Sequence, residues 1–311
     1  MRLASCILRL ALVALHSQRI THYENLLMSL QPLASPSRPQ HKRTLLLWLA
    51  LIPLALIVIA PMWHLAVYAF VPESAQFSWP FQWLPAQATL QNFNTLFEDP
   101  NMPALRWFFN TVIVTVVGTL LVVSISALSA YAFARLNFPG RDTIFFIMLI
   151  GLMVPTAVTL IPSFLLLRDI KVLNTHVALW IPAMANVGGV FLLRQGFFAI
   201  PRELEDAARV DGAGRFRIFW QVCLPLVQSS LVAQSILSFL FFWNDLLWPL
   251  IVLSDNAKLT LPVGILFMGF RTGMGLYFAA GFLSAIPALL FYAAFHRQIL
   301  EGVTAAGLTG R

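Results

Sequence analysis

Long apolar runs without charges are the feature that most limits what this chain can fold into. The stretch from Phe108 to Phe133 contains no Asp, Glu, Lys or Arg, and it exceeds the ~20 residues that an α-helix needs to cross a bilayer. Only 11% of all residues are charged, whereas soluble domains carry about 25%. Because so few charges cannot cover a water-facing surface, we expect the chain to lie in a membrane.

Six apolar segments predict an all-α fold with six transmembrane helices. A membrane β-barrel would need segments of about 10 residues that alternate apolar and polar side chains, and these runs do not alternate. The predicted helices are Leu45–Tyr68, Phe108–Phe133, Ile144–Leu167, Val177–Phe198, Leu226–Leu253 and Tyr277–Phe295.

Prolines and glycines interrupt two of these helices, at Pro155 and Pro162 and again at Pro182, Gly188 and Gly189. Both residue types are commoner in membrane helices than in soluble ones, because neighbouring groups can satisfy the backbone atoms that they free. We expect ordinary kinked packing at these positions. The alternative is a set of bends that lines a moving pathway.

The distribution of Lys and Arg predicts the orientation of the chain in the membrane. If the amino terminus is cytoplasmic, the cytoplasmic connections contain Arg135, Arg141, Arg202 and Arg209, among others. The connections on the other side hold fewer basic residues, as the positive-inside rule requires. We therefore expect a multi-pass protein with both termini in the cytoplasm. The formal net charge of +7 does not indicate nucleic-acid binding, since the basic residues lie between apolar runs rather than in one patch.

Three regions are expected along the chain: a cytoplasmic N-terminal segment (1–44), a transmembrane region (45–302) and a cytoplasmic C-terminal tail (303–311). The first 27 residues include LASCILRLALVAL, which is too short to span a membrane and is interrupted by Arg9. No small-residue cleavage pattern of a signal peptide follows it. Met28 opens a polar, proline-rich lead into the first helix, so we expect residues 1–27 to be an over-extended start.

A polar segment, residues 199–225, interrupts the apolar pattern between the fourth and fifth predicted helices. Pro201 suits the first turn of a helix, and Glu203 and Asp206 place negative charge where the helix dipole favours it. Gly212 predicts a left-handed turn that ends this helix. The segment is therefore expected to form a helix, a tight turn and a second helix.

The two predicted short helices differ in character. Leu204, Ala207 and Ala208 give the first helix a small, flat face that would let another protein approach closely. The second helix, from about Arg215, is expected to be amphipathic. Its apolar face is predicted at Phe216, Phe219, Trp220, Cys223 and Leu224. The alternative is a helix pair that lies on the bilayer surface, and the residues alone favour neither.

This segment resembles the cytoplasmic EAA loop of the permease subunits of binding-protein-dependent ABC importers. That loop reads Glu-Ala-Ala, three residues, Gly, nine residues, Ile, one residue, Leu-Pro. The corresponding residues here are Asp206-Ala207-Ala208, Gly212, Val222 and Leu224-Pro225, with matching spacing. Val replaces Ile, and Asp replaces Glu. Because Asp is shorter than Glu, Asp206 has a shorter reach toward a partner.

The resemblance covers the chain from Leu45 to about Gly302. AYAFARLNFPGR, LLRQGFFAIPRELEDAARVDGA and FFWNDLLWPLIVL are similar to the carbohydrate-uptake branch of this family, specifically its maltose-type second permease subunit. The resemblance implies a protein of a bacterial or archaeal inner membrane that is not an enzyme and binds no cofactor. ATP would be used by a separate ATPase subunit, in keeping with the absence of a Walker signature from the sequence.

The resemblance also implies a mechanism and a set of partners. A cytoplasmic ATPase dimer would receive the segment as a coupling helix, and a second, homologous permease would form the other half of a pathway for a sugar or oligosaccharide. An extracytoplasmic solute-binding protein would deliver the sugar, with membrane lipid around the permeases. The ATPase-coupling residues that it implies are Glu203, Leu204, Asp206, Ala207, Ala208, Asp211, Gly212, Leu224 and Pro225.

Polar residues form a stripe along the fifth predicted helix. Ser230, Gln234, Ser238, Asn244 and Asp245 share about a third of the circumference at ~100° per residue. Polar groups are costly in hydrocarbon, so the stripe should face protein or water. For Ser230 and Gln234 we expect packing against a partner permease. For Asn244 and Asp245 that role and a place in a sugar pathway are equal alternatives.

The predicted substrate-pathway residues are Ser238, Trp243, Asn244 and Asp245. Trp243 is amphipathic enough either to stack on a sugar face or to anchor at a membrane interface.

Three other functions are less consistent with the sequence. An intramembrane enzyme would need a catalytic set such as His-Glu-x-x-His. A secondary transporter would need an internal repeat and ion-coupling acids in its spans. The closest alternative keeps the same machinery and imports glycerol-3-phosphate or a related polyol phosphate. An anionic cargo would favour Arg or Lys in the pathway, and the fifth predicted helix contains neither.

Overall fold

The computed structural model describes the backbone of residues 40–76, 82–268 and 273–308, and the side chains of residues 47–76, 82–268 and 273–296. Over these residues the chain is helical without a strand, which confirms the predicted all-α class. The described residues fall into two units, which divide between Pro61 and Met62. The predicted start near Met28 lies outside the described residues.

Among the described residues, the helices that lie between the long helices α4 and α15 in the chain are short or broken. In chain order the described helices are α2 (Gln40–Ala69), η1 (Glu73–Ala75), α3 (Gln91–Glu98), α4 (Ala104–Arg135), α5 (Arg141–Gly151), α6 (Thr156–Asp169), α7 (Val177–Met184), α8 (Val187–Phe198), α9 (Arg202–Val210), α10 (Arg215–Arg217), η2 (Ile218–Cys223), α11 (Leu224–Leu226), α12 (Gln228–Asn244), α13 (Leu247–Val252), η3 (Asn256–Lys258), α14 (Leu261–Met268) and α15 (Met274–Leu308).

The first unit contains the start of α2, whose described side chains from Leu47 to Ile59 are exposed and mostly apolar. An exposed apolar helix surface of this kind suits contact with lipid. Searched over the described residues, three single helices have the length and composition to cross a membrane: Leu47–Ala69, Ala104–Arg135 and Met274–His296.

Three pairs of helices pass the same test together but bend sharply at a short break. The bend is 104° between α5 and α6, 51° between α7 and α8, and 80° between residues 215–226 and 228–244. If each pair is one span, the described residues give six spans. The predicted count of six therefore stays a prediction.

Two of these bends correct the expectation of ordinary kinks. α6 starts after Pro155, which has an extended backbone with a ψ of 135°. α8 starts after Asn186, whose side-chain oxygen accepts a hydrogen bond from the N–H of Gly189 at 2.7 Å. A side chain that satisfies a free N–H group in this way caps the start of a helix. The chain thus ends one helix and begins another at each position.

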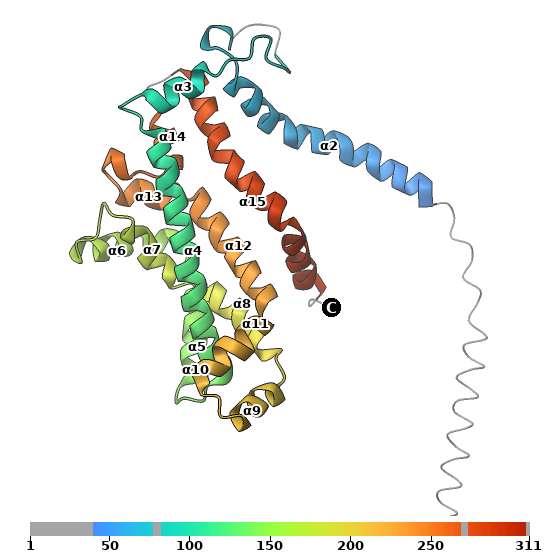
Figure 1. Cartoon of the computed structure of the whole chain (residues 1–311), viewed down its shortest axis with the longest axis vertical. Coiled ribbons are helices and arrows are strands. Elements are labelled where there is room, and N and C mark those ends of the chain that lie inside the picture. The colour runs from blue at the N-terminus through green and yellow to red at the C-terminus, as the bar shows by residue number, and fades with distance from the viewer. Residues whose placement is uncertain (1–39, 77–81, 269–272, 309–311) are drawn as a thin grey trace, which may run out of the picture. The chain divides into compact units, whose positions relative to one another are not determined.

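The long helix α4 organises the second unit. It packs against α7, α8 and α12, and Figure 1 shows it running beside α12. Near its start, Asn110 Nδ2 donates to the carbonyl oxygen of Leu259 at 2.9 Å, and the hydroxyl of Thr111 accepts from the N–H of Leu261 at 2.7 Å. These bonds fix the chain as it enters α14.

A buried apolar cluster joins residues 199–225 to α4 and α8. These residues are called the coupling segment below, after the role that the sequence resemblance implies. Ile218 and Phe219 of this segment lie in one cluster with Tyr131 of α4 and Phe197 of α8. The ring of Tyr131 lies 5.0 Å from that of Phe219 and 5.6 Å from that of Phe197, measured between centroids. The second half of the coupling segment is therefore anchored in the core of this unit.

Candidate functional site

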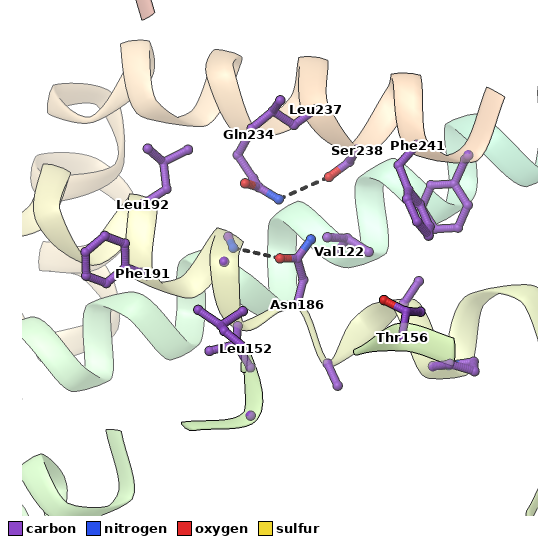
Figure 2. Close-up of a pocket in the computed structure, with 18 residues that line it drawn as sticks. Val122, Leu152, Thr156, Asn186, Phe191, Leu192, Gln234, Leu237, Ser238 and Phe241 are labelled. Atoms are coloured by element: carbon purple, nitrogen blue, oxygen red, sulfur yellow. Dashed lines mark hydrogen bonds between the residues drawn. The ribbon is translucent and has the colours of Figure 1, made fainter. Parts of the chain in front are cut away.

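An open cavity lies where α12 faces the breaks between α5 and α6 and between α7 and α8 (Figure 2). Its volume is about 720 Å³, within the range of about 300–1,000 Å³ that is usual for ligand pockets. The breaks place non-helical backbone in its wall. In a membrane protein such backbone is tolerated where it is buried in protein or lines a water-filled cavity, so the cavity explains why these breaks can exist.

Four neutral polar side chains lie in the wall of the cavity. Gln234 and Ser238 are one turn apart on α12, and the Gln234 Nε2 atom donates to the Ser238 hydroxyl at 3.1 Å (Figure 2). Asn186 and Thr156 come from the two breaks. Among the described residues that line the cavity, none is charged. Amides and hydroxyls both donate and accept hydrogen bonds, so the wall suits a neutral ligand rich in hydroxyl groups.

Close packing of α8 on α12 holds these polar groups in place. A Cβ atom at Gly189 would lie 2.6 Å from Nε2 of Gln234, and one at Gly196 would lie 2.7 Å from the hydroxyl of Ser230. Only glycine allows so close an approach without moving the polar side chain. Ser230 and Gln234 were expected to pack against a partner permease. Gln234 is buried against α8 of the same chain and not exposed to a partner, which corrects the expectation for this residue. Ser230 also faces α8 but is half-buried, so its contact with a partner stays a prediction.

The four predicted substrate-pathway residues lie in different surroundings. Ser238 lines the cavity. Trp243 is buried, and its indole N–H donates to the carbonyl oxygen of Ser284 at 3.1 Å. Asn244 is exposed, and Asp245 follows the end of α12, where a carboxylate oxygen lies 3.4 Å from the N–H of Trp248. The structure does not bring Trp243, Asn244 or Asp245 to the wall of the cavity, and their roles stay predictions.

Thr156 and Asn186 are wall residues that the sequence interpretation missed. The signal was present, since Thr156 directly follows the recognised interruption at Pro155 and Asn186 lies two residues before the one at Gly188. That interruption was interpreted as a kink. A polar residue at the end of a broken helix would have been a candidate had the break been expected.

The first half of the coupling segment presents an exposed helix. α9 begins after Pro201, and Leu204 of its predicted small face is 45% exposed. Ala207 is also exposed, whereas Ala208 is half-buried and packs against the cluster that holds Phe219. The predicted flat face is therefore made by Leu204 and Ala207. Glu203, Asp206 and Asp211, three of the predicted coupling residues, are exposed as well.

Gly212 ends α9 as predicted, with a positive φ of 82°. Its N–H donates to the carbonyl oxygen of Arg209 at 3.0 Å, and the N–H of Ala213 donates to that of Ala208 at 2.9 Å. These two bonds form a Schellman motif, which satisfies the last carbonyl groups of a helix and needs a left-handed residue at this position. The turn between the two short helices thus depends on a glycine.

The second short helix differs from the regular amphipathic helix that was predicted. Residues Ile218–Cys223 form a π-helix just before Pro225. The wider turn divides the predicted apolar face, because Phe219 and Cys223 are buried while Phe216 and Trp220 are exposed. Leu224 is half-buried.

One buried acid of α9 was not predicted. Glu205 is 3% exposed, unlike its neighbours in the acidic run. Its carboxylate oxygen Oε1 lies 3.0 Å from Nε of Arg135, at the end of α4. Nothing in the local pattern separates Glu205 from Glu203 and Asp206, because its burial depends on a helix that is remote in sequence.

Comparison with known proteins agrees with these features. Residues 123–299 match the family described as "Binding-protein-dependent transport system inner membrane component". The arabinooligosaccharides transport system permease protein AraQ of Halalkalibacterium halodurans is 33% identical over 261 residues, which are 83% of this chain and 93% of AraQ. The sn-glycerol-3-phosphate transport system permease protein UgpE of Yersinia enterocolitica is 30% identical over 256 residues, 80% of this chain and 91% of UgpE.

The fold also has a counterpart among solved structures. A chain from a bacterial ABC transporter involved in the import of the acidic polysaccharide alginate superposes with a TM-score of 0.76, covering 85% of this chain and 98% of that chain. Sequence identity is 22%, so this likeness concerns the fold. The helical architecture, the match over more than half of the chain and the relatives at 30% identity or more agree with the resemblance predicted from the sequence. The chain belongs to the family of binding-protein-dependent transport system inner membrane components.

Proposed function

We propose that this chain is one of two permease subunits of an ATP-driven importer and forms half of the translocation pathway for a sugar or oligosaccharide. The wall of the cavity carries this proposal. Thr156, Asn186, Gln234 and Ser238 supply hydroxyl and amide groups, and no described lining residue is charged. Neutral donors and acceptors of this kind pair with sugar hydroxyls without requiring a counter-charge. The arabinooligosaccharide named for the relative AraQ is a cargo of this class.

The coupling segment is the proposed contact with a cytoplasmic ATPase dimer. Leu204 and Ala207 form an exposed, small surface on α9, and the Schellman turn at Gly212 sets the angle between α9 and the anchored residues Ile218 and Phe219. An ATPase groove that closes around α9 would displace it as a unit. ATP is hydrolysed in that separate subunit, and this chain binds no cofactor.

The remaining partners follow from the family. The family description names dependence on a binding protein, which supports delivery of the sugar by an extracytoplasmic solute-binding protein. A second, homologous permease would complete the pathway. Both chain termini lie in the cytoplasm, on the same side of the inner membrane as the coupling segment.

Import of glycerol-3-phosphate is the second candidate, because the relative UgpE is named for that cargo. A phosphate would favour Arg or Lys in the wall, since charge-assisted hydrogen bonds to a guanidinium or ammonium are the strong ones. The described lining residues include neither, so a neutral sugar remains the preferred cargo.

Transport by the reconstituted complex tests this proposal. Proteoliposomes would contain this chain, its partner permease, the ATPase and the binding protein of the same system. Uptake of a panel of neutral oligosaccharides, including an arabinooligosaccharide, would be compared with uptake of sn-glycerol-3-phosphate, with and without internal ATP. We expect ATP-dependent uptake of a neutral sugar. Preferential uptake of sn-glycerol-3-phosphate would establish the other cargo, and sugar uptake that is independent of ATP would contradict the mechanism.

A further inference from the structure

A buried ion pair joins the end of α4 to α9. The side chains of Arg135 and Glu205 are each 4% exposed, and Arg135 Nε lies 3.0 Å from Glu205 Oε1. The second carboxylate oxygen of Glu205 lies 3.5 Å from Nη2 of Arg209. Burying charges is costly unless each is well paired, and here one carboxylate lies between two guanidinium groups. Glu205 is therefore held from two directions.

The same guanidinium also binds the end of α8. Arg135 Nη2 donates to the backbone carbonyl oxygens of Phe197, in the last turn of α8, and of Ile200, two residues after α8 ends. A planar guanidinium can hold a carboxylate and two carbonyl groups in fixed directions, whereas a lysine ammonium on its flexible stem cannot do so equally well. One side chain thus ties α4, α8 and α9 together.

Two of these helices reach the cavity. Val122 of α4 and residues 187–189, 191 and 192 of α8 line its wall, and α4 packs along both α8 and α12. Within α9, the inward contacts come from Glu205 and from the small side chain of Ala208. Among the described residues, the ion pair is the charged contact that links α9 to the helices that shape the cavity.

We propose that Arg135 is a positioning residue through which displacement of α9 moves α4 and α8, and so changes the cavity. This inference rests on the proposed coupling of the chain to an ATPase. It assigns to one ion pair a step that the coupling proposal leaves open, namely the contact that carries motion from α9 into the membrane helices. Such coupling exists only if the ATPase contact on α9 and the cavity bias the same helices between two arrangements. An effect of the ATPase on the cavity can be measured.

The test measures how nucleotide in the ATPase changes access to the cavity. Leu237, a wall residue on α12 that is 59% exposed, is replaced by Cys in the assembled complex. The rate of its modification by a methanethiosulfonate reagent is followed by mass spectrometry of the peptide that contains residue 237. The readout is the ratio of rates without and with MgATP and vanadate. A defect of folding alone lowers recovery of the complex and does not change this ratio.

We expect the ratio of the parent chain to fall by about tenfold, toward 1, in Arg135→Gln, since coupling between sites is typically 5- to 150-fold. Glu205→Gln should reduce the ratio similarly. Because both substitutions remove the same ion pair, the double variant should lower the ratio no further than the more severe of the two single variants does. Arg135→Lys should be intermediate. Arg141→Gln is the matched control, because Arg141 pairs at 3.0 Å with Asp142, whose side chain is 73% exposed. Its ratio should match that of the parent chain.

An unchanged ratio in recovered Arg135→Gln complex would overturn the inference. Should that variant fail to assemble, the isosteric Glu205→Gln decides, and an unchanged ratio there has the same consequence. A ratio of 1 in the parent chain would instead overturn the proposed ATPase coupling itself, and the inference with it.

Discussion

Replacing Gly212 by Val should uncouple ATP hydrolysis from transport while leaving the complex assembled. The φ of Gly212 is 82°, and a Cβ placed there would meet no atom within 4 Å. The free-energy cost of the substitution therefore comes from the backbone conformation and not from a steric clash with neighbouring atoms. A left-handed backbone costs an L-residue roughly 1–2 kcal/mol, and a β-branched side chain is especially unfavourable there.

This magnitude decides what the assay should detect. About 1–2 kcal/mol lowers the population of the native turn by roughly 5- to 30-fold relative to other turn conformations. Those conformations would re-aim the Leu204 and Ala207 surface with respect to Ile218 and Phe219, which stay anchored in the core. The stimulation of ATPase activity by loaded binding protein should then fall by a similar factor. It would be measured on the purified complex in lipid, beside sugar uptake.

Gly214 offers a matched control two residues away. Its φ is −71°, which any residue adopts, and a Cβ there would also meet no atom within 4 Å. In Gly214→Val, the stimulation of ATPase activity by loaded binding protein and the uptake of sugar should therefore match those of the parent chain. Gly212→Asn should retain most of its stimulation, because Asn tolerates the left-handed region. Full stimulation and uptake in Gly212→Val would refute the reasoning that the turn sets the coupling geometry.

Three further substitutions test other parts of the account. Ala207→Trp should fill the exposed face of α9 and weaken co-purification of the ATPase several-fold without loss of the permease pair, and normal ATPase recovery would contradict this. Asp245→Asn should impair uptake with the complex intact if Asp245 serves the pathway, whereas a failure to assemble would assign it a structural role. Gly264→Ala should lower thermal stability in detergent, because its Cβ would lie 2.1 Å from the buried ring of Trp107, and overpacking costs about 1–3 kcal/mol. Gly151→Ala, whose Cβ meets nothing within 4 Å, is the control, and an equal loss in both would count against the packing argument.

Features set by neighbouring residues could be predicted from the sequence. The apolar runs and the scarcity of charge indicated helices in a membrane. The order of Pro201, the acidic residues and Gly212 predicted a helix that ends in a left-handed turn, and the φ of Gly212 confirms the turn. These predictions succeed because a proline, a glycine or an apolar run restricts its own backbone wherever it lies.

Features set by remote residues could not be predicted in the same way. Pro155 and Pro182 indicated interruptions, but the bends of 104° and 51° depend on how the following helices pack. The burial of Glu205 depends on Arg135 in another helix. The π-helix at Ile218–Cys223 lets Phe219 point inward and Trp220 outward, so a fixed period of 3.6 residues placed these two side chains on one face incorrectly.

Cross-linking from α9 tests the central claim most directly. Val210, at the end of α9, is 88% exposed, and a photoreactive amino acid in its place would capture whatever protein contacts this helix in the assembled complex. The account predicts a cross-link to the ATPase subunit from residue 210, and none from the exposed Asn101, which we expect on the opposite side of the membrane. A cross-link to the ATPase from residue 101 but not from residue 210, or to lipid alone from residue 210, would contradict the account.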